Sequence, residues 1–156
     1  MQHRIRAAGI AVKNDAILLV KHTMNNRTFW IPPGGGREDC DVTTKDTVIR
    51  ELKEESGLDA EAGPLIFIRE FAEISGDTYH LELYYLLENI TGDITLKNLE
   101  GLGRDEYYIS ETRWVSLEEA KTLKIYPACL IEETQKQLSA DFIVPQYLGR
   151  ETEGDY

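Results

Sequence analysis

The sequence predicts an α/β fold in which helices cover a mixed β-sheet. Segments rich in apolar, β-branched and aromatic residues lie on both sides of one amphipathic helical segment, residues 43–57, and further helical segments follow near the C-terminus. With 156 residues, of which 42% are hydrophobic and 29% charged, the chain has the size and composition of one compact domain. We expect that domain to span residues 1–148 and a polar tail to follow at 149–156.

The N-terminal part predicts two strands. Residues 4–12 and 16–21 are apolar, and the turn signal Lys13-Asn14-Asp15 separates them, so we expect a β-hairpin. The stretch Trp-Ile-Pro-Pro-Gly-Gly-Gly follows at 30–36. Because its prolines lack amide donors and its glycines permit positive φ, we expect this stretch to be irregular.

Residues 43–57 carry the start and stop signals of a helix. Thr43 is a candidate N-cap, Asp46 lies three residues on as the acid of a capping box, and Gly57 suits the residue that ends a helix. Apolar residues recur at helical spacing on one face: Val48, Ile49 and Leu52.

The C-terminal half predicts two longer strands and then shorter elements. Residues 65–74 and 79–88 have strand composition with a turn at 75–77, whereas 89–111 is polar and irregular. The remaining expected elements are a short strand at 113–115, a helix from the N-cap Ser116 to about Leu123 with Glu119 as capping-box acid, and a last helix from Pro127 to about Leu138.

Charge and cysteine content narrow the classes of function. Lys plus Arg number 17 and Asp plus Glu number 28, so the net charge is −11, which disfavours nonspecific binding to nucleic acid. The two cysteines, Cys40 and Cys129, form neither a disulfide framework nor a zinc-binding pattern. No secretory leader or bilayer-length apolar run is evident, so we expect a cytoplasmic protein without a membrane partner.

Three carboxylates lie close together on the predicted helix. Glu51 and Glu54 are three residues apart, and Glu51 and Glu55 are four apart, so all three share one helix face. Like charges at these spacings repel, and a hard cation such as Mg²⁺ would offset the repulsion through oxygen ligands. Taken by itself, such a cluster is more often a solvated helix face than a metal site.

The segment Gly36–Leu58, GREDCDVTTKDTVIRELKEESGL, resembles the Nudix box, Gly-x5-Glu-x7-Arg-Glu-U-x-Glu-Glu-x-Gly-U, in which U is a bulky aliphatic residue. The flanks at 30–35 and 113–119 also resemble those of the family. Val42 stands where the box has its first Glu, and Asp41, Asp39 and Glu38 are nearby acids that could replace it. The matching positions are Gly36, Arg50, Glu51, Leu52, Glu54, Glu55, Gly57 and Leu58.

The resemblance to Nudix hydrolases (MutT-like) implies a Nudix-like α/β/α sandwich and a reaction. Glu54 and Glu55 would be the main ligands of Mg²⁺ (or Mn²⁺), with the Gly35 carbonyl nearby. Glu51 would bind metal or polarise the attacking water, and Arg50 would orient the acids. The reaction would be hydrolysis of a pyrophosphate bond in a nucleoside diphosphate linked to another group, a small nucleotide-type substrate. A homodimer is compatible with this reading.

Two questions stay open at this point. Because Val42 departs from the box, a catalytically weak nucleotide-binding or regulatory module is the alternative function. The residues that mark ADP-ribose or dinucleoside polyphosphate hydrolases are not in place, so neither substrate is favoured.

The family often takes a general base from a loop outside the box. Among the acids at 98–111 we prefer Glu106, because it lies just before the Arg-Trp-Val strand; the others are Glu100, Asp105 and Glu111. Arg4 and Arg6 alternate on the first strand and could meet a substrate phosphate. Exposed edge charges are an equally ordinary reading of this pair. His80 and Glu82 could line a substrate site, although a solvated strand face is the more common reading of such a pair. Trp30, Tyr84 and Tyr85 could stack on a base, although aromatic residues in such positions more often belong to the core.

Overall fold

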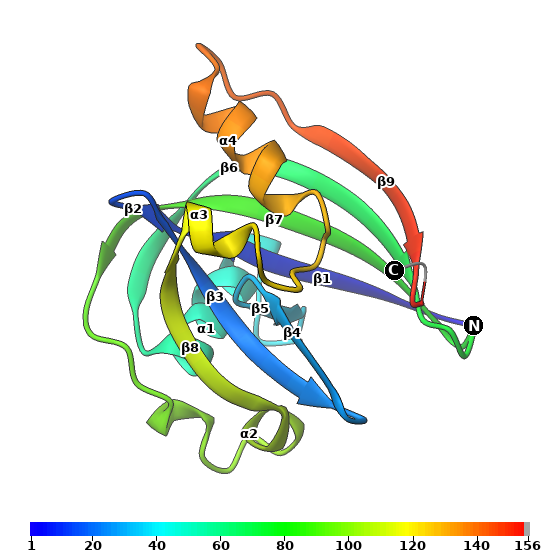
Figure 1. Cartoon of the computed structure of the whole chain (residues 1–156). Coiled ribbons are helices and arrows are strands. Elements are labelled where there is room, and N and C mark those ends of the chain that lie inside the picture. The colour runs from blue at the N-terminus through cyan, green and yellow to red at the C-terminus, as the bar shows by residue number, and fades with distance from the viewer. Residues whose placement is uncertain (155–156) are drawn as a thin grey trace.

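The computed structural model describes residues 1–154 and shows two β-sheets with helices packed on both sides of them (Figure 1). The predicted mixed α/β fold is therefore confirmed. In chain order the elements are β1 (Gln2–Ile10), β2 (Val12–Lys13), β3 (Ala16–Met24), β4 (Arg27–Ile31), β5 (Gly34–Gly36), α1 (Thr44–Ser56), β6 (Asp59–Ala72), β7 (Thr78–Thr91), a 3₁₀ turn η1 (Lys97–Leu99), α2 (Arg104–Tyr108), β8 (Ile109–Ser116), α3 (Leu117–Ala120), α4 (Leu130–Ser139) and β9 (Gln146–Thr152).

The larger sheet has five strands in the order β5-β1-β7-β6-β9. It is mixed, because β1 runs parallel to β7 and β6 parallel to β9, whereas β5 and β6 are antiparallel to β1 and β7, respectively. The smaller sheet consists of β2, β3, β4 and β8 and is antiparallel. One apolar core lies under α1 and includes Val48 and Leu52, a second includes Leu130 and Ile131 of α4, and a third, smaller one contains Leu99.

The helix predicted at 43–57 is confirmed, with Thr43 and Gly57 as its cap residues. Thr43 accepts a hydrogen bond from the backbone N–H of Asp46, and the Asp46 carboxylate accepts one from the backbone N–H of Thr43, so the capping box is complete. Gly57 ends α1 with a φ of 74°, in the left-handed region. The cap residues thus fix where the helix begins, and this determines which of its side chains face the sheets.

Two N-terminal expectations were wrong. The expected hairpin between 4–12 and 16–21 is reduced to the two-residue pairing of β2 with β3, because β1 is a central strand of the other sheet and pairs with β5 and β7. The stretch 30–36 is not wholly irregular, since it contains the end of β4 and all of β5. Gly34 and Gly35 are needed for space, because a Cβ at Gly34 would lie 2.6 Å from Cα and Cβ of Ala8 and a Cβ at Gly35 would overlap Glu51.

The C-terminal boundary also differs from the expectation. Residues 149–152, expected in a polar tail, lie in β9 and extend the larger sheet next to β6. The helix expected to reach Leu123 ends at Ala120, and the last helix begins at Leu130. Residues 155–156 of the expected tail lie outside the described residues. In the described chain, every helix is too short or too polar to cross a bilayer.

Candidate active site

The two buried carboxylates of α1 face the glycine strand β5. Glu51 and Glu55 are four residues apart and only 4% and 1% exposed. The backbone N–H of Gly34 donates a hydrogen bond of 3.1 Å to Glu55 Oε2. A Cβ placed on Gly35 would overlap the Glu51 carboxylate. The Gly-Gly-Gly sequence therefore allows the backbone of β5 to approach both acids directly.

A third carboxylate comes from a different part of the chain. Asp105 on α2 contributes this carboxylate. One of its oxygens, one oxygen of Glu51 and one oxygen of Glu55 all lie within 4.8 Å of one another. Glu106, which we had preferred, is exposed and accepts a hydrogen bond from the backbone N–H of Gly101 instead. Sequence reasoning had named Asp105 only as an alternative, since spacing alone does not show which acid of a short helix faces α1.

Glu54 lies at the edge of this cluster. Its side chain is about a quarter exposed and accepts a hydrogen bond of 3.4 Å from Arg50 Nη1, which also donates to Glu51 Oε1 at 2.9 Å. Arg50 Nη2 donates to the carbonyl of Gly36 at 3.0 Å. The arginine thus joins the carboxylate face of α1 to the glycine strand.

The acid that orients Arg50 is Asp41. Arg50 Nε donates to Asp41 Oδ1 at 3.0 Å and Nη2 to Oδ2 at 2.8 Å, which is a bidentate pair. Thr47 and the backbone N–H of Glu38 donate to the same carboxylate, and together these contacts hold the pKa of Asp41 far below its usual range. Val42 is 85% exposed. The acid of the box is therefore supplied one residue early, and Val42 takes no part in the cluster.

Burial raises the pKa of both inward carboxylates. The pKa of Glu51 is raised to about 7, mainly by burial and against the opposing charge of Arg50. The pKa of Glu55 lies well above its usual range, through burial and then through the charge of Glu51. Within residues 1–154, Glu51 Oε2 is buried without a hydrogen-bond partner. An all-oxygen site with one unpaired buried oxygen fits a hard divalent cation such as Mg²⁺ or Mn²⁺.

Basic side chains of β1 lie beside the same glycine strand. Arg6 is the sheet partner of Gly36, and Arg4 Nη2 lies 3.7 Å from the position of a Cβ on Gly36. Arg6 Nε is 3.8 Å from Glu82 Oε1. Glu82 itself is buried and bonded to Arg69 Nη1 at 3.1 Å and to the hydroxyl of Tyr84 at 2.7 Å, so it does not belong to a solvated strand face.

The remaining aromatic candidates belong to the core. Trp30 and Tyr84 are 6% and 3% exposed and pack in the core that includes α4. Arg69, which sequence reasoning missed, is buried beside Glu82 and Glu151. The only signal for it was a pair of charged residues, Arg69 and Glu70, in the otherwise apolar run Leu-Ile-Phe-Ile-Arg-Glu-Phe.

The fold and the cluster define a class of protein: two sheets, a glycine strand, and a capped helix whose inward acids meet an arginine oriented by an upstream acid. The sequence model of the NUDIX domain matches residues 3–134, and the chain belongs to the NUDIX family. Among curated proteins, the ADP-ribose pyrophosphatase of Methanocaldococcus jannaschii is 30% identical over 88 residues, which is 55% of this chain and 51% of that protein. The chain thus matches about half the length of this relative.

Solved structures share the fold at lower identity. Escherichia coli ORF135 protein superposes with a TM-score of 0.70 at 21% identity, covering 90% of this chain and 94% of that one. The MutT NUDIX hydrolase of Burkholderia pseudomallei gives 0.68 at 19% identity, with 85% and 98% covered. An ADP-ribose pyrophosphatase of Streptococcus suis gives 0.65 at 20% identity, with 92% and 98% covered.

Proposed function

We propose that the chain is a metal-dependent pyrophosphohydrolase that cleaves a pyrophosphate bond in a nucleoside diphosphate linked to another group. The observation that carries this proposal is the meeting of Glu51, Glu55 and Asp105 within 4.8 Å beside the glycine strand of a NUDIX domain. The site combines three acids with one partly compensating arginine, which is the arrangement expected of a cation site rather than of a solvated helix face.

Each acid has a proposed role. Glu51, Glu55 and Asp105 would hold Mg²⁺ or Mn²⁺, with Glu54 and the Gly35 carbonyl as further ligands. A bound ion would neutralise negative charge on the pyrophosphate and activate the attacking water. Glu51 is also our candidate for polarising that water, because one of its carboxylate oxygens is buried without a partner within the cluster.

Arg50 would act through the acids. It contacts Glu51 and Glu54 and is itself fixed by Asp41, so it holds two carboxylates in orientation without facing the substrate. Arg4 and Arg6, beside Gly36, are the side chains we assign to the substrate phosphates. They offset locally the net charge of −11, which would otherwise repel an anionic nucleotide.

The alternative of a catalytically weak module rested on Val42. Since Asp41 makes the contacts to Arg50 and Val42 is exposed, that motivation disappears. The names of two similar proteins make ADP-ribose the first substrate to try. Sugar nucleotides, dinucleoside polyphosphates and nucleoside triphosphates complete the panel.

The test is turnover of this panel with Mg²⁺ or Mn²⁺ in ¹⁸O-labelled water. The label is expected on a product phosphate, and activity should disappear with excess chelator. Glu51→Gln should lower kcat strongly with a smaller change in KM, because the lost group acts mainly in the transition state. Label on a sugar carbon, or full activity with chelator, would overturn the mechanism.

A further inference from the structure

The outward face of the larger sheet is only partly covered by α1. Residues directly opposite one another in a sheet point to the same side, so the strand register defines three rows on this face. The row nearest α1 is Ala7, Leu83, Ile68 and Tyr147; the next is Ile5, Leu81, Glu70 and Arg150; the last is His3, Tyr79, Ala72 and Thr152.

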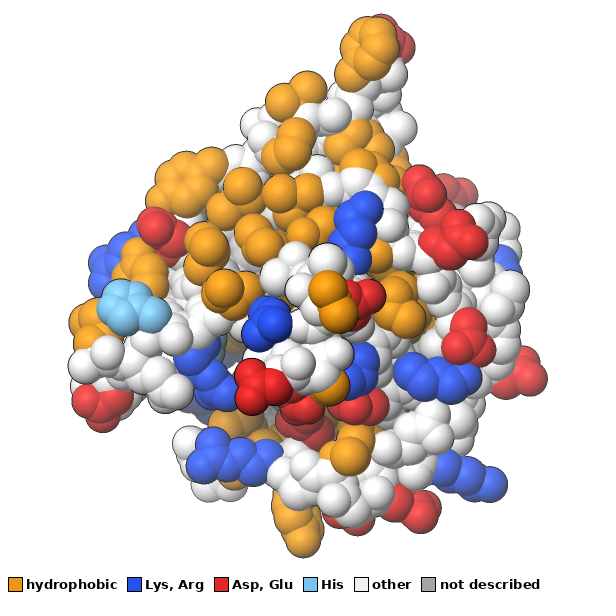
Figure 2. All heavy atoms as spheres, turned by 180° about the vertical axis from the view of Figure 1, so that it is seen from behind, with side chains coloured by type: hydrophobic (Ala, Val, Ile, Leu, Met, Phe, Trp, Pro, Cys, Tyr) orange, Lys and Arg blue, Asp and Glu red, His pale blue; other side chains and the backbone are white. Residues whose placement is uncertain are grey.

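Of these rows, only the first reaches the core under α1, through Ala7 and Leu83. α4 packs on the opposite side, in the core that contains Phe67 and Tyr84. Among the described helices, none therefore covers the second and third rows. Figure 2 shows hydrophobic side chains gathered on this side of the molecule, in the upper left of the view.

Exposed apolar residues are concentrated on and around these rows. Of the eleven large hydrophobic residues exposed in the described chain, five lie on these rows or at the adjoining end of the sheet: Met1, Ile5, Ile74, Leu81 and Tyr147. We call these five residues and the three rows the outer sheet surface. If a free large side chain offers about 150 Å², the five exposed fractions amount to about 440 Å².

That area is about half of the roughly 800 Å² that each partner buries in an interface of standard size. Contiguous apolar surfaces of several hundred Å² usually mark interaction sites. Half-buried Ile68, Leu83 and Tyr79 add further apolar area to the same surface. The outer sheet surface is therefore large enough to form the apolar centre of an interface.

The charge of this surface favours a second copy of the chain. The rows contain one acid, Glu70, and one base, Arg150, which are direct sheet partners. Glu70 also accepts a hydrogen bond of 2.7 Å from the hydroxyl of Tyr147. Glu73 lines the hollow at one end of this surface, so the surface carries about one net negative charge on a chain whose net charge is −11, and two copies could meet here with little of their mutual repulsion.

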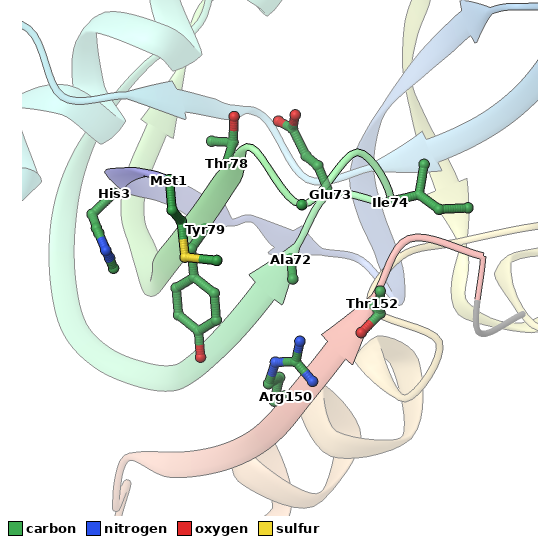
Figure 3. Close-up of a pocket in the computed structure, with 10 residues that line it drawn as sticks. Met1, His3, Ala72, Glu73, Ile74, Thr78, Tyr79, Arg150 and Thr152 are labelled. Carbon is green, nitrogen blue, oxygen red and sulfur yellow. The ribbon is translucent and has the colours of Figure 1, made fainter.

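The surface also carries both a projection and a hollow. Tyr147 is 62% exposed at one end of the rows. At the other end, Met1, Tyr79, Ala72 and Arg150 line a shallow cavity of about 320 Å³, into whose mouth the Tyr79 ring and Arg150 point (Figure 3). A two-fold axis between them would place the projection of each copy over the hollow of the other, as an isologous interface requires.

Pairing through the sheet edge is disfavoured. The pairing of β6 with β9 changes register between Ile68 and Glu70, and Gly149 has a φ of 89° at that irregularity. Bulged edge strands resist edge-to-edge association. A contact between copies through this surface, rather than through the β9 edge, would therefore be face to face, with two sheets stacked as in a β-sandwich.

We propose that the outer sheet surface is a homodimer interface in which two copies stack this face about a two-fold axis. Neither the NUDIX active-site cluster nor its substrate enters the argument, so the proposal stands apart from the proposed function.

The test is the mass of the full chain in solution by sedimentation velocity over a range of micromolar concentrations. The wild type should sediment as two chains. Leu81→Glu and Tyr147→Glu should each raise the dimer dissociation constant more than about tenfold, because a charge is placed in an apolar contact. Tyr147→Phe should keep the dimer. Val42→Glu is the matched control, since it adds the same charge at an exposed apolar residue outside the surface.

Circular dichroism and melting temperature verify that each variant is folded. A wild type that is monomeric throughout, or a dimer that Leu81→Glu and Tyr147→Glu leave unchanged, would overturn the proposal. A monomeric wild type that co-sediments with phosphatidylcholine vesicles would assign the surface to a lipid instead, and this too would overturn it.

Discussion

Replacing Glu51 by Gln should change how stability depends on pH. In the folded chain the pKa of Glu51 is about 7, whereas its ordinary value is 4.5. The folded state therefore binds a proton more readily than the unfolded state, and the wild type loses stability as pH rises from 4.5 to above 7. At 1.36 kcal/mol per pKa unit, this loss is about 3 kcal/mol, and the variant lacks it.

The measurement is urea unfolding of both proteins with chelator at pH 4.5 and pH 8. The free energy of unfolding of Glu51→Gln minus that of the wild type should rise by about 3 kcal/mol between these pH values. Packing differences between Glu and Gln do not depend on pH, so they cancel in this comparison. The pKa of Glu55 contributes in the same direction, because the charge of Glu51 helps to raise it.

Two further measurements sharpen the result. The control Glu106→Gln removes an exposed carboxylate outside the cluster, and a rise of similar size in this control would show that the effect does not come from the cluster. With metal at 100 times its Kd, the difference at pH 8 should shrink by about 2.7 kcal/mol, because the bound ion stabilises the wild type by that amount. If the free energy of unfolding of Glu51→Gln minus that of the wild type stays constant or falls as pH rises, the electrostatic reasoning is refuted.

Three other substitutions test the site. Val42→Glu should leave kcat unchanged because Val42 is exposed, whereas Asp41→Asn should lower kcat about 10–100-fold by releasing Arg50; equal effects of the two would show that Asp41 is not the orienting acid. Asp105→Asn should weaken Mn²⁺ binding at least about tenfold in titration calorimetry, with Glu106→Gln as the unaffected control. Weaker binding in Glu106→Gln than in Asp105→Asn would show instead that Glu106 is the ligand. Gly35→Ala should abolish the Mg²⁺-induced rise in melting temperature, since its Cβ would overlap a cluster carboxylate, and an undiminished rise would contradict that geometry.

The helix and its site could largely be predicted because local rules fix them. The capping box at Thr43 and the stop at Gly57 depend on neighbouring residues, and they set which face of α1 carries Glu51 and Glu55. Asp41 was named as a replacement acid because it lies one residue from the expected position. Local spacing was therefore sufficient wherever the partners lie close in sequence.

Long-range pairing could not be predicted in the same way. The apolar run of β1 fits a hairpin as well as a central strand, and only the partner strand β7, some 76 residues later, decides between them. The strand β9 was missed because its polar composition suits an edge strand as well as a tail. Asp105 could not be chosen over Glu106, because that choice depends on how α2 packs near β3 and β8.

Both sheets contribute contacts to the carboxylate cluster. Glu55 is bonded on one side to Gly34 of β5, and on the other its carbonyl accepts a hydrogen bond of 2.7 Å from Thr112 of β8. Asp105 belongs to α2, the helix directly before β8. An ion shared by these acids would be released by any fluctuation that separates one sheet from the other. Bound metal should therefore slow amide hydrogen exchange in β5 and β8 together and make the two sheets unfold as a single cooperative unit.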